Sequence, residues 1–263
     1  MVEAMVAAFF RRFLSGAPRL QRVSGPPTSS NGASSMHLFW EVPPHPLSEV
    51  RADLTVVEPP AVDKLYFWAL QVNFVDAGAD RGGAHIGLQH HPTYPGGGAV
   101  NWGGYHPHGG GELDGSVSEL PSALGNVNTR DYQWQGGRPY RFRVFQAEQG
   151  RWRGTVTDLE SGVETMLRDL YVEADALVRP MVWSEVFADC DHPTTAVRWT
   201  NLSADLAGGG EVRALSVRTN YQSFANGGCD NTNSAVDPDH GGFVQRTNID
   251  RVNRGGSVLT LPQ

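Results

Sequence analysis

Apolar and polar residues alternate with a period of two along much of this chain. The clearest runs are 36–42, 65–74, 140–145, 196–202 and 211–221. Successive side chains of a strand point to opposite faces of a sheet, so this alternation predicts β-strands. Glycine-rich turns separate the runs, for example at Gly208 to Gly210 and at Asn226-Gly227. The pattern predicts an all-β protein built as a single antiparallel β-sandwich of the jelly-roll or concanavalin-like type.

The same alternation assigns the two faces of three strands. In 65–74 the even positions Tyr66, Trp68, Leu70, Val72 and Phe74 are apolar, which places Gln71 and Asn73 on the opposite face. In 83–91 the apolar set Ala84, Ile86 and Leu88 leaves His85, Gln89 and His91 on the other side. In 182–191 the core set is Val182, Ser184, Val186, Ala188 and Cys190, and the opposite face carries Trp183, Glu185, Phe187, Asp189 and Asp191.

The opposite faces of these strands combine rings with hydrogen-bonding groups. A pyranose has an apolar face that stacks on an aromatic ring, and its hydroxyl groups suit amides, imidazoles and carboxylates. We therefore predict a carbohydrate-binding, lectin-like module with Trp183 and Trp102 as stacking surfaces. Its expected ligand-binding residues are Gln71, Asn73, His85, Gln89, His91, Trp102, Tyr105, Trp183 and Glu185. The simpler interpretation of each strand alone is a solvated sheet face.

Two other function classes remain open. The first is a glycan-cleaving hydrolase or lyase in which Glu185 and Asp189 act as the catalytic carboxylates. On a regular strand Asp189 and Asp191 would project from one face about 6.6 Å apart, within the separation that glycosidases use, whereas Glu185 and Asp189 would be about 13 Å apart. Glu185 could instead act with a carboxylate from another strand. The second is a protein-interaction module that assembles through the glycine- and histidine-rich loops. The oligomeric state is not predicted.

Metal binding is predicted only weakly. Asp230, Asn233, Asp237 and Asp239 supply oxygen ligands that suit calcium, although their spacing does not match an EF-hand loop and turn formation, which explains the same residues without an ion, is the favoured interpretation. The local pairs His90-His91 and His106-Pro107-His108 make zinc a weaker candidate. No cofactor is expected to be required.

Composition narrows the classes of partner. The 263 residues contain 40% hydrophobic residues and carry a net charge of −7, and no basic cluster is present, so nucleic acid is not an expected partner. No apolar stretch approaches the roughly 20 residues of a membrane-spanning helix. Two cysteines, Cys190 and Cys229, are compatible with one disulfide or with two buried thiols.

The first 35 residues differ from the rest of the chain. Glu3 precedes the apolar run and Arg11 and Arg12 follow it, the reverse of the order in a secretory signal. We expect residues 1–35 to be a disordered extension, or a stretch upstream of a true start at Met36, rather than an organelle-targeting peptide. Residues 36–263 are then the sandwich domain. The expected compartment is the cytoplasm, with secretion as the second choice.

Several segments in order, LFWEVPP, YFWALQVNF with GAHIGLQ, RWRGTVTDLESG, WSEVF, and NGGCDNTN with QRTNIDR, resemble an uncharacterised bacterial domain family. The resemblance covers most of 37–262. It implies a concanavalin-type β-sandwich and an association with carbohydrate, and it supplies no catalytic residues.

Overall fold

The structure is a computed structural model that describes residues 24–262, and its regular elements are almost entirely strands. Two short 3-10 helices are Pro107–Gly109 (η1) and Phe224–Asn226 (η2). The strands are β1 (Ser34–Trp40), β2 (Leu47–Glu58), β3 (Tyr66–Asp76), β4 (Ala79–His90), β5 (Gly98–Tyr105), β6 (Thr129–Asp131), β7 (Pro139–Glu148), β8 (Arg151–Asp158), β9 (Val163–Tyr171), β10 (Ala176–Val186), β11 (Ala196–Leu206), β12 (Glu211–Arg213), β13 (Ser216–Tyr221), β14 (Thr232–Asp237), β15 (Gly242–Thr247) and β16 (Val258–Thr260).

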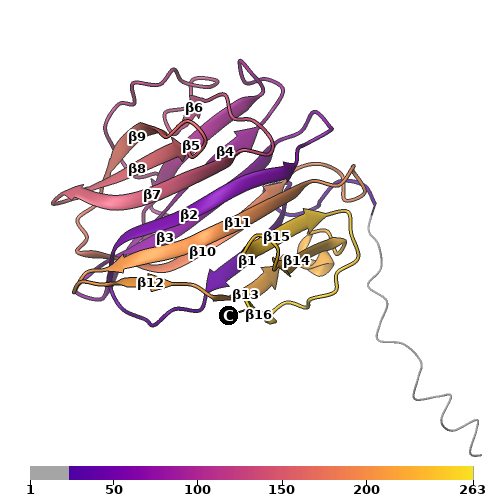
Figure 1. Ribbon diagram of the computed structural model, residues 1–263. Coiled ribbons are helices and arrows are strands. Elements are labelled where there is room, and N and C mark those ends of the chain that lie inside the picture. The colour runs from indigo at the N-terminus through magenta and orange to yellow at the C-terminus, as the bar shows by residue number, and fades with distance from the viewer. Residues whose placement is uncertain (1–23, 263) are drawn as a thin grey trace, which may run out of the picture.

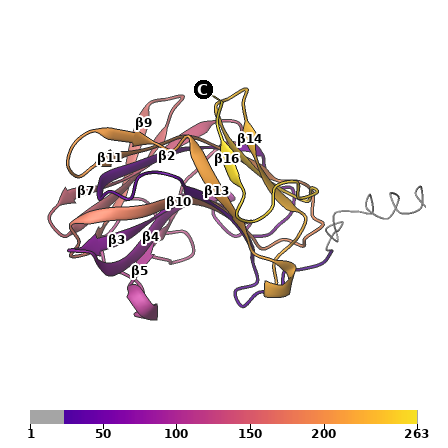
Figure 2. The same ribbon diagram turned by 90° about the horizontal axis from the view of Figure 1, so that it is seen from below.

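These strands form two antiparallel layers (Figures 1 and 2). The first, here called the β10 sheet, has the order β6-β5-β4-β3-β10-β1-β13-β16. The second, the β2 sheet, has the order β14-β15-β11-β2-β7-β8-β9, with β12 added to β11. A single register pair, Leu177 with Leu47, joins β10 to β2, so the layers are continuous at one corner. The predicted antiparallel β-sandwich is the observed fold.

The hydrophobic core lies between the two sheets, where the alternation predicted it. Tyr66, Trp68, Leu70, Val72 and Phe74 are all at most 1% exposed and belong to one cluster. The corresponding residues of β4, namely Ala84, Ile86 and Leu88, pack into the same cluster. Apolar side chains from β2, β7 and β11 complete it from the other sheet, among them Leu54, Phe142 and Trp199. The face assignments for β3 and β4 are therefore confirmed.

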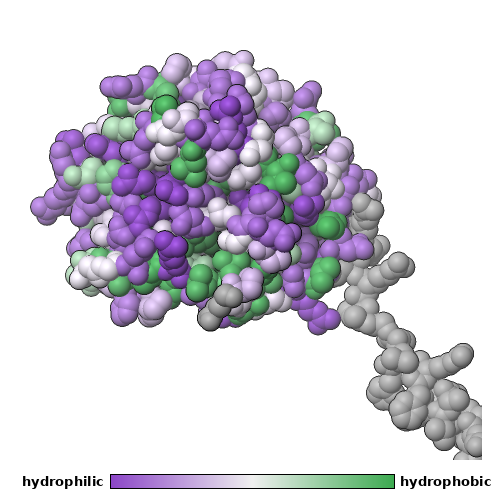
Figure 3. Space-filling view, in the orientation of Figure 1, coloured by the Kyte–Doolittle hydropathy of each residue, from purple (hydrophilic) through white to green (hydrophobic). Residues whose placement is uncertain are grey.

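The outer face of the β2 sheet is covered by ion pairs. Arg141 binds Asp53 through two hydrogen bonds of 2.7 and 2.8 Å. Arg143 binds Glu49 at 2.9 and 3.0 Å, and Arg153 binds Asp169 in the same two-pronged manner. Hydrophilic residues cover most of the surface in Figure 3. The guanidinium groups of Arg141, Arg143 and Arg153 are already bound to carboxylates, so the outer face of the β2 sheet offers few free hydrogen-bonding groups to a ligand.

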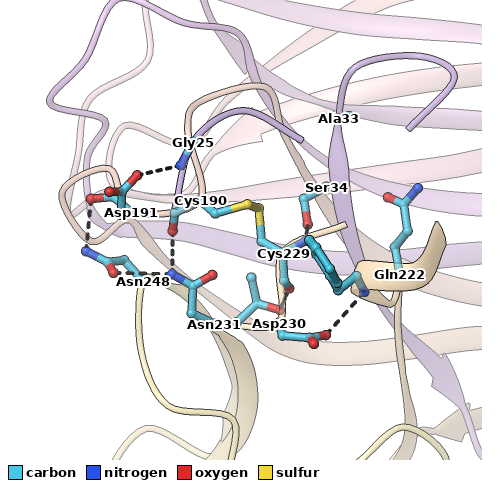
Figure 4. Close-up of a disulfide and its surroundings, with 12 residues drawn as sticks. Gly25, Ala33, Ser34, Cys190, Asp191, Gln222, Cys229, Asp230, Asn231 and Asn248 are labelled. Carbon is cyan, nitrogen blue, oxygen red and sulfur yellow. Dashed lines mark hydrogen bonds between the residues drawn. A yellow bond between two sulfur atoms is a disulfide. The ribbon is translucent and has the colours of Figure 1, made fainter. Parts of the chain in front are cut away.

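Cys190 and Cys229 form a disulfide, which selects one of the two states left open by the sequence. The bridge joins the turn after β10 to the turn before β14 (Figure 4). Backbone hydrogen bonds attach the chain around Gly25 and Thr28 to the same region, because Cys190 N donates to Gly25 O at 2.7 Å and Thr28 N donates to Gly227 O at 2.9 Å. We call residues 25–33 the N-terminal strap.

The predicted boundary at residue 35 is wrong in part. The strap is packed against the domain, and β1 begins at Ser34, so a chain starting at Met36 would lack two strand residues as well as the strap. The remainder of the predicted extension, residues 1–23, lies outside the described residues. Within the described part of the chain, no helix has the length and apolar character needed to cross a membrane.

Candidate functional site

Five rings gather on the outer face of the β10 sheet, opposite the core. They are His37 and Phe39 of β1, Phe67 of β3, His85 of β4 and Trp183 of β10, and we call them the His/aromatic cluster. Sheet register brings them together although they are distant in sequence, since His37 pairs with Trp183. The ring of Phe67 meets those of Trp183 and His85 edge-on at 4.8 and 5.4 Å. This second cluster is separated from the main core by the sheet itself.

Gln71 links the cluster to the loop side of the sheet. The indole N–H of Trp183 donates to Gln71 Oε1 at 3.0 Å, and Gln71 Nε2 donates to the hydroxyl of Tyr105 at 3.0 Å. Tyr105 extends across Gly83, where an added Cβ would come within 2.7 Å of the phenol oxygen. Trp183, Gln71 and Tyr105 are thus held in one hydrogen-bonded row.

The two histidines of the cluster are uncharged near neutral pH. Burial lowers the pKa of His37 to about 4 and that of His85 to about 4, because desolvation disfavours the imidazolium. The Nδ1 atom of His37 is buried and has no hydrogen-bond partner among the described residues. A neutral imidazole carries one donor and one acceptor, so this face presents both kinds of group without added charge.

Glu185 lies beside Phe67 at the end of β10. The two residues are register partners, and Asn31 Nδ2 of the N-terminal strap donates to Glu185 Oε1 at 2.9 Å. Burial raises the pKa of the Glu185 carboxyl, and the hydrogen bond from Asn31 acts in the opposite direction. The strap therefore supplies a hydrogen bond to a carboxyl group that is partly removed from water.

The remaining predicted ligand-binding residues lie on or beside this face. Gln89 is 6% exposed and accepts a hydrogen bond from Tyr94 at 2.8 Å, so its side chain is already engaged. Asn73 donates to the carbonyl of Gly82 at 3.5 Å. His91 lies just beyond the end of β4, where its ring contacts Thr93 and Tyr94. The centre of the site is therefore the His/aromatic cluster. Gln89 borders it as the register partner of Phe67, whereas Asn73 pairs with Gly83 and His91 lies beyond the end of β4.

Trp102 was predicted to be a stacking surface, and this prediction is wrong. Its side chain is fully buried in the core between the sheets, where its ring lies against Gly154 of β8. Gly103 and Gly104 follow Trp102 in β5, so the sequence shows no alternation of apolar and polar side chains that would tell which face of this strand is buried. Trp102 belongs with Trp68 and Trp152 as a structural residue.

The predicted strand 182–191 is also shorter than expected. β10 ends at Val186, and Asp189 and Asp191 lie in the following turn, with Asp191 accepting a hydrogen bond from Gly25 N at 3.1 Å. The regular spacing that would have placed these two carboxylates on one strand face is therefore absent. Trp183 and Glu185 do share the outer face, as predicted, because β10 is regular through both positions.

The predicted calcium ligands are not brought together as a cluster. Asp237 pairs with Arg198 at 2.6 Å and with His240, and Asp230 accepts hydrogen bonds from Arg251 and Phe224 N. Asn233 Oδ1 accepts from two backbone N–H groups in the segment after β15. Across residues 24–262, no group of three or more His, Cys, Asp or Glu side chains has the arrangement of a metal site.

The sequence-based prediction missed four contributors to the site. His37 and Phe39 alternate with Met36, Leu38 and Trp40 in β1, so the same period-two argument applied to that strand identifies them. Phe67 occupies an odd position in the strand that gave Gln71 and Asn73. Asn31 had no local signal, because its partner is 154 residues away in the sequence.

A pocket between the sheets lies apart from this face. It is lined by Ser34, Met36, Val186, Ala188, Cys190, His192, Cys229, Thr232 and Thr247. None of the predicted ligand-binding residues is among them. The pocket and the His/aromatic cluster are thus different parts of the structure.

Comparison with known proteins gives similarity in fold only. No family model and no curated protein matches the chain, so membership of the uncharacterised bacterial family stays a prediction. Solved structures with a similar strand arrangement include SCP-B, a member of the Eqolisin family of peptidases, with 11% identity, a TM-score of 0.47 and coverage of 86% of this chain and 98% of that chain. Scytalido-glutamic peptidase has 13% identity, a TM-score of 0.45 and the same coverage. Peanut lectin has 12% identity and a TM-score of 0.27, covering 65% of this chain and 93% of that chain. At these TM-scores no activity or residue role is transferred to this chain.

Proposed function

We propose that the outer face of the β10 sheet binds a carbohydrate or a similar polyhydroxylated ligand without changing it. The observation that carries this proposal is the His/aromatic cluster, a group of five rings on the sheet face that does not form the main core. Rings of this kind bind the apolar faces of sugars, and the neighbouring amide, imidazole and carboxyl groups suit their hydroxyls. The expected contacts are Phe39, Trp183, Gln71, His85 and Glu185.

The contrast between the two outer faces supports the choice of face. On the β2 sheet the polar side chains are charged and paired with each other, which satisfies their hydrogen bonds internally. On the β10 sheet the histidines are neutral, and His37 keeps an unpaired ring nitrogen. A neutral ligand with many hydroxyl groups fits the second face better, because it need not displace an existing ion pair.

A glycan array probed with the full-length chain, with and without a chelator, tests the proposal. Binding of a defined glycan that is recovered with unchanged mass supports a lectin-like module. A shortened glycan would instead support the glycan-cleaving alternative with Glu185 at its centre. No binding to any glycan on the array would contradict the proposal and leave the protein-interaction class.

A matched pair of phenylalanines locates the binding face. Phe39 lies on the outer face of the β10 sheet and Phe145 on the outer face of the β2 sheet, where Arg143 stacks on it at 4.8 Å. Both rings are partly exposed. We expect Phe39→Ala to weaken glycan binding by about tenfold or more, whereas Phe145→Ala leaves it within about twofold. Equal effects of the two substitutions would place the ligand elsewhere.

A further inference from the structure

Two arginines enter the same end of the sandwich from opposite sheets. Arg130 lies on β6 and shares its face with Val100, a core residue of β5. Arg168 lies on β9 opposite Gly154, and Gly154 packs against the core ring of Trp102. Both side chains therefore point inward. Arg130 is 7% exposed and Arg168 is 3% exposed, so both are more than nine-tenths buried.

Neither of these buried arginines has a carboxylate partner. Among residues 24–262, every other arginine forms an ion pair except Arg179 and Arg254, which are exposed. Arg251, whose side chain is 8% exposed, is paired with Asp230. The Nε atoms of Arg130 and Arg168 are inaccessible to water and make no hydrogen bond. Buried guanidinium groups are normally paired, so this arrangement calls for a partner that residues 24–262 do not supply.

The surroundings hold Arg168 in place but do not neutralise the pair. Its Nη1 atom donates to Asn128 Oδ1 at 2.9 Å and to Val127 O at 3.4 Å, and Asn128 Nδ2 donates to Glu112 Oε2 at 3.0 Å. Arg130 makes no hydrogen bond with any described residue through its guanidinium. Each charge disfavours the other, and the pKa values of both arginines are lowered, chiefly by burial and for Arg168 also by the charge of Arg130. The Val127 carbonyl, the relay through Asn128 and the negative charges of Glu112 and Asp114 act on Arg168, and they leave the Nε atoms of both arginines without a partner.

A segment of the loop before β6 closes over this end of the sandwich. Leu113 N donates to Gly104 O in β5, and Ser116 N donates to Asp169 O in β9, so residues 113–116 bridge the two sheets. Gly115 lies directly against Arg168, since an added Cβ would come within 2.3 Å of its Nη2 atom. The chain thus brings the backbone of Gly115 against the guanidinium group of Arg168, close enough to Arg130 for the two positive charges to interact.

We propose that Arg130 and Arg168 form a binding site for an oxyanion, either the carboxylate of an organic acid or an inorganic phosphate or sulfate. A guanidinium group presents parallel N–H donors that match the oxygens of such anions, and one anion between two arginines would satisfy donors on both. The site is separate from the His/aromatic cluster, so a test of oxyanion binding is independent of the proposed carbohydrate binding.

Thermal unfolding of the full-length chain in sodium phosphate, against sodium chloride of equal ionic strength, tests the site. Phosphate also stabilises proteins by exclusion from their surface, so the comparison is made between variants. We expect a saturable rise in the Tm of the wild-type chain at millimolar phosphate, and none in Arg130→Gln. Arg254→Gln, which removes an exposed and unpaired guanidinium, is the matched control and keeps the rise. An equal rise in Arg130→Gln and wild type would overturn the proposal.

Arg130→Gln is the informative substitution because Arg130 makes no hydrogen bond that the change would break. In buffer without oxyanions we expect this variant to be at least as stable as the wild type, since it removes a buried, unpaired charge. Isothermal titration then identifies the source of the anion. Galacturonate binding that galactose does not reproduce indicates a sugar carboxylate, and phosphate binding alone indicates an inorganic ligand. In either case Arg130→Gln should weaken binding by about tenfold or more. The absence of measurable binding by both anions to the wild type would contradict the site.

Discussion

Asn31 donates a hydrogen bond to Glu185 across 154 residues of sequence, at 2.9 Å. Asn31 belongs to the N-terminal strap, which is fastened by backbone hydrogen bonds beside both ends of the Cys190–Cys229 disulfide. Glu185 lies at the end of β10, next to the His/aromatic cluster. The carboxyl group of the candidate site therefore depends on a segment whose position is set by the disulfide region, and several measurable consequences follow from this arrangement.

The first prediction concerns the pH dependence that Glu185 contributes. Because burial raises its folded-state pKa above the ordinary value of 4.5, the folded chain binds a proton more tightly than the unfolded chain. The free energy of unfolding should then fall as the pH rises from the pKa of Glu185 in the unfolded chain to its pKa in the folded chain, and it should stay lower above that pH. Glu185→Gln should remove this fall and should be more stable than the wild type at neutral pH. Urea unfolding of both chains across about pH 4 to about pH 8 measures the difference.

Asn31→Ala provides the matched variant for this prediction. The hydrogen bond from Asn31 lowers the pKa of Glu185, so its loss should raise that pKa further and widen the pH range over which stability falls. In the double variant with Glu185→Gln, the effect of Asn31→Ala on the pH profile should disappear. A pH profile that is the same in wild type and Asn31→Ala would show that the hydrogen bond does not form in solution.

The second prediction has the opposite sign and concerns the histidines. The folded-state pKa values of His37 and His85 are about 4, below the ordinary 6.5, so the unfolded chain binds protons more tightly than the folded chain in this range. The contribution of these two histidines to the free energy of unfolding has its full value above about pH 6.5, and it is lost as the pH falls toward 4. His85→Gln should reduce this acid sensitivity. The measurement is the urea midpoint between pH 4 and 7, with exposed His45→Gln as a control that should leave the slope unchanged.

The third prediction separates the core from the outer cluster. Trp68 is 1% exposed between the sheets, so Trp68→Ala should lower the free energy of unfolding by about 3 to 5 kcal/mol. Trp183 is 6% exposed and bonded to Gln71, so it is not a free surface ring, and Trp183→Ala should cost about 2 kcal/mol. Chemical denaturation measures both changes. A loss for Trp183→Ala equal to that for Trp68→Ala would contradict the separation of the two clusters.

The parts of this structure that the sequence predicts are those governed by local alternation. The inner faces of β3 and β4 follow from the period of two, because each strand is regular and bordered by a packed core. Trp102 was misplaced because two glycines follow it in β5 and hide the alternation. Asp189 was misplaced because β10 ends at Val186, where the chain turns toward the disulfide. The Asn31–Glu185 contact and the Arg130–Arg168 pair depend on strand order, which no local pattern contains.

The last prediction concerns the disulfide. Cys190 and Cys229 are separated by 39 positions, and closing a loop of this length in the unfolded chain stabilises the fold by about 4 kcal/mol in the chain-entropy description. The Cys190→Ser, Cys229→Ser double variant should lose about that amount in urea unfolding. Wild type treated with a reductant should lose as much, whereas the double variant should be insensitive to the reductant. The strap is attached beside both cysteines, so loss of the disulfide should loosen the strap and weaken the hydrogen bond from Asn31 to Glu185. The effect of Asn31→Ala on the pH profile should therefore be smaller in the chain without the two cysteines than in the wild type. An unchanged effect of Asn31→Ala would show that the strap is held by its own hydrogen bonds rather than by the disulfide.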